Sequence, residues 1–375
     1  MVCAVKSLVS SFLAVVQLLL FPAVGVTSNR DVLVTDAGFN TAVCGASTKA
    51  VSQRGAVIAE QSFDFSAPVW GKATFESYLP AAEGQDVVFV IKNDDYEIEL
   101  EGFNEENTCS PSGTTFSSVN AVSFPDYNED GLQDILVICT YNAPDNFYDK
   151  QYLRRDVRIY DAQENGEFLL NTAISQELSA LSHTEIINSV PSALNYLAYK
   201  KSGGDNWENT YAAIVHSSVY MPEQWALLPS NHSDYPVLAF CTGNYSGIIT
   251  YNESSGKMDS AFYQGTISYI PSDDVVHFGG GKYGMYSDVV YQFEQGGLSL
   301  SGSGEYYNTG EELNALEYDG ILNRYITQHY KWNGEKVDRN TYMKELLSVY
   351  DVYSGKEPKF CTEEEILEQI KTWNE

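Results

Sequence analysis

Between Asp31 and Asn308 the chain consists mostly of short apolar runs and of segments in which apolar and polar residues alternate. Segments of this kind, bounded by turn residues, predict β-strands. DVVFVIK (Asp86–Lys92) is predicted to form a hairpin with the alternating YEIELEGF (Tyr96–Phe103). ILVICTY (Ile135–Tyr141) is continuously apolar, which is typical of a strand that is covered on both faces.

A loose repeat adds to this pattern. An apolar strand, a turn and a Tyr-rich strand follow one another in DILVICTYN…DVRIYDAQENGEFLLN and again in PVLAFCTGNYSGIITYNESSGKMDSAFY. Such repetition is typical of propeller blades or of stacked, similar β units. We therefore expect a mainly β fold, propeller-like or built from repeated antiparallel β units. Further strands are predicted at Arg155–Ala162, Ala212–Tyr220, Pro236–Gly243, Ser246–Asn252, Ser260–Ile270 and Tyr286–Gly304.

Helical spacing appears at two places. SQELSALSHTEIINSV (Ser175–Val190) carries apolar residues at helical intervals and predicts one helix within the β-rich part. Near the C-terminus, Asp338 is a predicted N-cap, and Thr362 with Glu365 forms a predicted capping box. We expect residues 310–375 to be a mixed, mostly helical C-terminal tail, and residues 26–309 to form the β-rich domain.

The N-terminus has the features of an export signal. Lys6 precedes an apolar stretch from Leu8 to Phe21, and Ala23 and Gly25 supply small residues after it. This pattern predicts a secretory signal peptide over residues 1–25. An uncleaved N-terminal anchor is the alternative, because Ser7–Val26 approaches the length that spans a bilayer. Both interpretations predict a secreted, extracellular or cell-surface protein.

The charge of the chain limits its partners. The chain has 375 residues and a formal net charge of −29. A surface this acidic repels nucleic-acid phosphates and anionic lipids, so we expect no nucleic acid, and no membrane contact beyond an N-terminal anchor. The 27 tyrosines and five tryptophans leave a protein or a glycan as the expected partner, although most of these rings are expected to pair across strands.

The cysteines indicate no metal or redox motif. The chain has six, and no two have C-x-x-C spacing, which excludes a zinc ribbon and a thioredoxin-like pair. Cys139 and Cys241 lie in apolar runs and are expected to be buried and reduced. A Cys44–Cys109 disulfide remains open from the sequence.

The clearest chemical motif is the acidic stretch PDYNEDGLQD before the apolar run at Ile135. It matches the pattern D-x-[DN]-x-[DN]-G, in which alternate oxygen-bearing side chains on a tight turn converge on one Ca²⁺ ion. An EF-hand would need Glu at the twelfth position and a flanking helix, but that position is Val137 within a predicted strand. The predicted ligands are Asp126, Asn128, Asp130, the carbonyl of Leu132, and Asp134.

This loop, which leads directly into a strand, resembles the FG-GAP or VCBS-type calcium repeat of integrin-α-like propellers and many secreted bacterial proteins. The resemblance covers about fifteen residues and implies a β-propeller or part of one. A second, fainter resemblance covers the C-terminal part, where Asn333, Gly334, Val337, Asp338 and Tyr342 match a segment found in exported proteins of Gram-positive gut bacteria. It implies no activity.

The remaining motifs favour binding over catalysis. No H-E-x-x-H, G-x-S-x-G or P-loop pattern is present. We expect an exported, calcium-binding β-rich interaction or structural module that is not an enzyme, with Ca²⁺ as its cofactor. The alternative is a secreted, glycan-active hydrolase with carboxylates that the sequence does not pair; two inward-facing carboxylates across a cleft would favour it.

Overall fold

The computed structural model describes residues 53–102, 114–143, 152–204, 206–218, 222, 224–252, 255–282, 285–294, 297–309, 316–319 and 324–373. Strands account for 47% and helices for 23%, and the described residues form four antiparallel sheets, so the mainly β prediction is confirmed. The described residues do not form a closed propeller. The predicted signal peptide and the Cys44–Cys109 pair lie outside the described residues.

The first two sheets pack against each other. The first contains β1 (Arg54–Val57), β2 (Phe63–Ala67), β3 (Gly71–Pro80), β4 (Val88–Lys92) and β5 (Glu97–Glu99). The predicted hairpin is confirmed there, because β4 and β5 pair antiparallel. The second is the meander of β6 (Thr115–Ser123), β7 (Ile135–Ala143), β8 (Tyr152–Ala162) and β9 (Phe168–Leu170).

Strand β7 is buried on both faces, as its continuous apolar sequence predicts. Ile135, Val137 and Cys139 pack with the first sheet, whereas Leu136 and Ile138 pack with the helices on the other side. Alternate side chains of a strand point to opposite faces, so each core receives every second residue. The loop that precedes β7 is therefore anchored to the most buried strand of its sheet.

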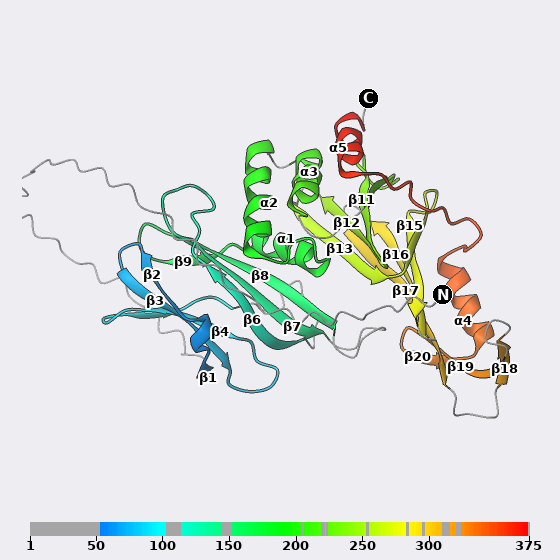
Figure 1. The fold of residues 1–375 in the computed structure, drawn as a ribbon, viewed down its shortest axis with the longest axis horizontal. Helices are drawn as coiled ribbons and strands as arrows, with labels where there is room; N and C mark the ends of the chain where they lie inside the picture. The colour runs from blue at the N-terminus through cyan, green and yellow to red at the C-terminus, as the bar shows by residue number, and fades with distance from the viewer. Residues whose placement is uncertain are drawn as a thin grey trace, which may run out of the picture. The chain divides into compact units, whose positions relative to one another are not determined.

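Three helices separate this sheet from the next one (Figure 1). They are α1 (Thr172–His183), α2 (Val190–Gly203) and α3 (Trp207–Ser217), and α1 contacts both β8 and the following sheet. The predicted helix at Ser175–Val190 is confirmed in its first half; it ends at His183. Over Ala212–Ser217 the predicted strand at Ala212–Tyr220 is wrong, because these residues belong to α3. Asn206 caps this helix, and its Trp207, Tyr211 and Ile214 are buried at helical spacing.

The third sheet is the meander β10 (Gln224–Leu228), β11 (Val237–Thr242), β12 (Tyr245–Asn252) and β13 (Lys257–Gln264). One face packs on the helices and the other on the fourth sheet. The fourth sheet contains β14 (Thr266–Ile270), β15 (Val275–Lys282), β16 (Met285–Glu294), β17 (Gly297–Thr309), β18 (Leu316–Asp319), β19 (Arg324–Trp332) and β20 (Glu335–Val337).

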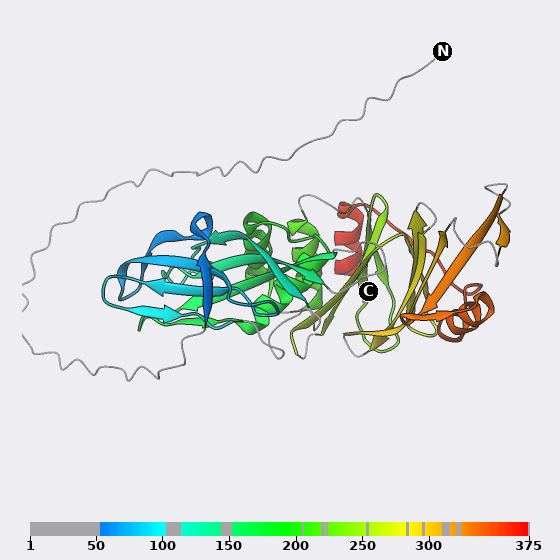
Figure 2. The ribbon, with the colours of Figure 1, turned by 90° about the horizontal axis from the view of Figure 1, so that it is seen from below.

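The C-terminal segment, predicted as mixed and mostly helical, contains three strands in addition to its two helices in the described residues. It begins with β18, β19 and β20, and β19 pairs with β17, so the sheet crosses the expected domain boundary at residue 310. The predicted caps are confirmed: Asp338 caps α4 (Arg339–Val349), and Thr362 and Glu365 form the capping box of α5 (Glu363–Thr372). Helix α4 packs on β17 and β19, whereas α5, red in Figures 1 and 2, contacts α3 and β10.

None of the helices in the described residues has the length and apolar character needed to cross a membrane.

Candidate metal loop and the adjoining pocket

The acidic stretch forms a closed turn between β6 and β7. The backbone N–H of Asp134 donates to the carbonyl of Pro125 at 2.7 Å, which ties the two ends of the loop together. Gly131 has a φ of 88°, in the left-handed region that glycine adopts without strain, and Glu129 has a φ of 60°. These two positions reverse the chain within a few residues.

Within the turn, the polar side chains fold back onto the backbone. An Asp126 carboxylate oxygen accepts from the N–H of Gly131 at 3.0 Å. The Asn128 amide oxygen accepts from the N–H of Asp130 at 3.0 Å, and an Asp130 oxygen accepts from the N–H of Leu132 at 2.8 Å. The predicted oxygens are therefore gathered on one turn and held by its amides, as in nested Asx turns.

Acidic side chains alone do not make a metal site here. In the part of the chain that the structure describes, no three or more His, Cys, Asp or Glu side chains gather closely enough to hold a metal ion. A Ca²⁺ ion in this loop would depend on the Asn128 amide and the Leu132 carbonyl in addition to the carboxylates, since Ca²⁺ takes six to eight oxygens.

Asp134 is the residue that best fits a bound cation. Its side chain is 0% exposed. One carboxylate oxygen accepts from the N–H of Ala162 at 2.9 Å, while the other, Oδ2, has no donor in hydrogen-bonding geometry among the described residues; the backbone N–H of Tyr127 is near enough only to lower the pKa of this carboxyl. Burial raises the pKa of Asp134 to about 6, and the nearby carboxylates of Asp161 and Asp130 add to the rise, against the hydrogen bond from Ala162. A buried, unpartnered carboxylate oxygen is costly, and a cation in the loop would satisfy it.

A polar network connects the loop to helix α1. The Tyr127 hydroxyl donates to Asp161 Oδ1 at 2.7 Å, and the Asn171 amide donates to Asp161 Oδ2 at 2.9 Å. Asn171 is also the N-cap of α1, where its side chain accepts from the N–H of Ile174. Burial, and then the hydrogen bond to Asp161, raise the pKa of Tyr127. The loop, β8 and the start of α1 are therefore joined through hydrogen-bonded side chains.

Helix α2 holds the outer side of the loop. The Lys201 ammonium donates to the carbonyl of Asn128 at 2.7 Å and pairs with the Glu129 carboxylate at 2.8 Å. Both side chains of the ion pair are well exposed, so its Coulomb energy is small and screened. Its effect is to place the C-terminal turn of α2 over the acidic loop.

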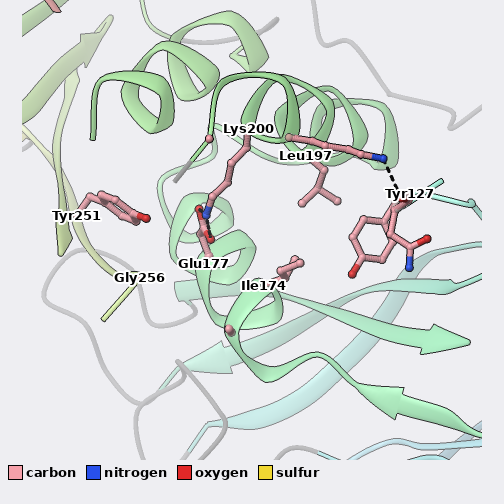
Figure 3. Close-up of a pocket in the computed structure, with 11 residues that line it drawn as sticks. Tyr127, Ile174, Glu177, Leu197, Lys200, Tyr251 and Gly256 are labelled. Atoms are coloured by element: carbon pink, nitrogen blue, oxygen red, sulfur yellow. Dashed lines mark hydrogen bonds and ion pairs between the residues drawn. The ribbon is translucent and has the colours of Figure 1, made fainter. Parts of the chain in front are cut away.

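A pocket with a volume of about 630 Å³ opens beside the loop. Figure 3 shows its walls, which come from the loop, α1, α2 and the β12–β13 hairpin. The lining residues are Tyr127, Asn128, Ala173, Ile174, Glu177, Leu197, Lys200, Lys201, Gly204, Tyr251 and Gly256. Asn128 belongs to both the pocket and the predicted metal ligands, so the two features share a wall.

A buried ion pair lies within the pocket. Lys200 donates to the two carboxylate oxygens of Glu177 at 2.6 and 2.5 Å, and the Tyr196 hydroxyl also donates to Glu177. Glu177 is only 5% exposed, and the Lys200 ammonium lies 5.6 Å from the centre of the Tyr251 ring. The pair is thus charge-neutral, largely desolvated and fixed by neighbours on both helices.

The fourth sheet contains a chain of Ser, His and Asp side chains. His277 Nε2 lies 2.7 Å from Asp288 Oδ1, and its Nδ1 lies 3.4 Å from the Ser268 hydroxyl. The hydroxyl of Tyr350 donates to Ser268 at 2.6 Å and that of Tyr342 to Asp288 at 2.6 Å. Because Tyr342 of α4 and its C-cap residue Tyr350 both donate to this chain, we interpret it as the attachment of α4 to the sheet and not as a nucleophilic site.

The structure thus brings together much of what the sequence predicted, and adds residues that it did not. Asp126, Asn128, Asp130 and Leu132 lie on one turn, and Asp134 lies at its buried end. The Glu177–Lys200 pair was not predicted, since it joins α1 to an unforeseen helix. The available signal was Glu177 itself, which is charged and lies beside Leu178 on an otherwise apolar helix face.

Comparison with known proteins adds no relative: no protein-family model, no curated protein and no solved structure matches this chain.

Proposed function

We propose that this protein is an exported, calcium-stabilised β-rich interaction module without catalytic activity. The observation that carries the proposal is Asp134, whose fully buried carboxylate has one oxygen without a donor among the described residues, at the end of a turn lined by Asp126, Asn128 and Asp130. A Ca²⁺ ion would supply the missing positive charge and join this buried oxygen to the exposed part of the loop.

The arrangement of the loop supports the same proposal. In this proposal the β6–β9 meander, with its acidic turn leading directly into a doubly buried strand, would be one blade-like calcium unit of the FG-GAP or VCBS type, and the β10–β13 meander would be a second unit without the loop. The ion would stiffen the turn and stabilise the folded state by mass action, because the unfolded chain lacks the site.

The pockets favour binding over hydrolysis of glycans. Glycoside hydrolysis requires two carboxylates on either side of the scissile bond. The pocket beside the loop is lined by the single carboxylate of Glu177, which is already paired with Lys200. A second pocket, of about 490 Å³, is lined by the single carboxylate of Asp259. We therefore place ligand binding, and not bond cleavage, in the pocket beside the loop.

Calcium titration by calorimetry, together with thermal unfolding, tests the proposal. We expect heat of binding and a higher melting temperature for the parent protein in millimolar calcium, and neither for Asp130→Ala. Asp64→Ala is the matched control, because Asp64 is an exposed aspartate on β2, away from the loop. A parent protein that shows neither heat nor a melting shift would remove the calcium proposal.

A further inference from the structure

We propose that the pocket between the acidic loop, α1, α2 and the β12–β13 hairpin binds a neutral, hydroxyl-rich ring, that is, an uncharged carbohydrate unit. This inference rests on the proposed function, because it names the class of ligand that the interaction module would bind. It stands on the volume of the pocket, the chemistry of its walls and the ion pair that lies within it.

The volume fits a small ligand. Pockets that bind small molecules occupy about 300–1,000 Å³ and combine apolar walls with a few fixed polar groups. This pocket, at about 630 Å³, lies within that range, and its walls come from segments that are distant in the sequence. The helices α1 and α2 are held by caps and by core packing, so the walls exist before any ligand arrives.

The walls suit the two kinds of surface that a sugar presents. Ile174 and Leu197 give an apolar surface on one side, and the ring of Tyr251 lies on the other side of the Glu177–Lys200 pair (Figure 3). A pyranose ring has C–H groups on its faces and hydroxyls around its edge. The faces can pack against the aliphatic and aromatic side chains, while the edge reaches the polar groups.

The buried ion pair selects against charge on the ligand. A hydroxyl both donates and accepts, so it can accept from the Lys200 ammonium and donate to the Glu177 carboxylate without separating them. A ligand carboxylate would compete with Glu177 for Lys200, and a ligand amine would compete with Lys200 for Glu177. Either competition leaves one buried charge without its partner, which is strongly unfavourable.

The acidic loop would affect the sugar affinity of this pocket, although the polar groups at the centre of the pocket come from α1 and α2. Asn128 lines the pocket, and Lys201 binds the carbonyl of Asn128 and the carboxylate of Glu129. Ordering of the loop by Ca²⁺ would fix that wall, so we expect tighter sugar binding with calcium than without it. The Glu177–Lys200 pair joins α1 to α2 and lies outside the loop sequence.

Saturation-transfer NMR and calorimetry with simple sugars test the inference. Maltose, cellobiose and lactose serve as neutral probes, with glucuronic acid and glucosamine as charged ones, all at millimolar concentration and in calcium. We expect binding of at least one neutral disaccharide and weaker binding of both charged sugars. Absence of binding by all of the neutral probes, or equal binding of the charged ones, would overturn the inference.

Two variants locate the binding to the pocket. Glu177→Gln removes the charge that fixes Lys200, and we expect sugar binding to weaken about ten-fold or more. Ile174→Trp fills the pocket from the apolar side and should abolish sugar binding. It provides an independent test in case Glu177→Gln does not fold. Glu185→Gln is the matched control, since Glu185 also forms an ion pair, with Arg155, but does not line the pocket. Unchanged affinity in folded Ile174→Trp would contradict the assignment.

The calcium proposal and the sugar-binding proposal can be refuted independently of each other. A calcium-induced melting shift without sugar binding would leave the calcium loop and remove the sugar pocket. Sugar binding that is identical with calcium and with a chelator, in a protein without heat of calcium binding, would remove the calcium proposal and leave the sugar pocket.

Discussion

Replacement of Asp134 by Asn is the sharpest test of the metal loop, because it should maintain or raise stability without calcium and remove the stabilisation that calcium gives. The carboxylate is fully buried and one of its oxygens lacks a donor among the described residues. Asn retains the shape and can still accept the hydrogen bond from the N–H of Ala162, but it removes the buried negative charge.

The size of the calcium-free effect follows from the raised pKa of Asp134, about 6. Holding this group ionised at pH 7 in the folded state therefore costs on the order of 3 kcal/mol relative to water. Without calcium we expect Asp134→Asn to be at least as stable as the parent, with a gain of up to about 3 kcal/mol.

With calcium the advantage of the variant should shrink to about zero or reverse. At a calcium concentration about 100 times Kd, the parent gains about 2.7 kcal/mol, while a variant without the ligand gains almost nothing. For a cooperative unit of this size the parent gain corresponds to roughly 4 °C in Tm.

Thermal unfolding of parent and variant, in a chelator and in calcium, measures all four stabilities. If Asp134→Asn is several kcal/mol less stable than the parent when a chelator removes calcium, the negative charge of Asp134 is already stabilised by the protein itself, and the reasoning is refuted. A variant whose Tm rises with calcium as much as that of the parent would refute its role as a ligand.

Two further predictions concern groups outside the loop. Burial lowers the pKa of His183 below its ordinary value, despite the hydrogen bond to Asp156, so the unfolded chain takes up this proton first as the pH falls. The stability due to neutral His183 is therefore present above about pH 6.5 and is lost at lower pH, by at most about 1.4 kcal/mol per pH unit. In His183→Gln, the free energy of unfolding, measured with urea, should depend less on pH between pH 7 and 5. An unchanged pH dependence would contradict this prediction. Tyr342→Phe removes the hydrogen bond to Asp288 and should lower the free energy of unfolding, measured with urea, by about 1.5–3 kcal/mol. Tyr353→Phe is the control, because Tyr353 is 90% exposed. Equal effects of the two changes would show that the hydrogen bond does not hold α4.

Local features of the sequence predicted much of the secondary structure correctly. The alternation in Tyr96–Phe103 and the continuous apolar run at Ile135–Tyr141 identified strands, because strand burial follows a two-residue period that any short segment displays. The caps at Asp338 and Thr362 were equally readable, since capping joins residues only three positions apart. The turn at Asp126–Asp134 was predictable for the same reason, because its residues are also close together in the sequence.

The errors came where burial overrides local preference. AAIVHSSVY contains apolar and β-branched residues, which predict a strand, but Ala212–Ser217 lie in helix α3, which packs against α2, α5 and β12. Burial on most sides of this helix leaves Ala212–Val215 continuously apolar, so this run alone does not show helical periodicity. The strands within residues 316–337 were missed. β19 pairs with β17, and β18 and β20 pair with β19, contacts that the local sequence pattern does not display.

The sequence by itself determined strands such as β7, β11 and β12, the caps and the identity of the residues in the acidic turn, because each of these depends on neighbours within about ten positions. Only the tertiary structure decided the burial of Asp134, which requires β8, and the pairing of Glu177 with Lys200, which requires two helices to meet. The pocket beside the loop exists only because four separate segments converge. Burial and desolvation arise from such long-range packing, and they give these charged side chains their chemical character.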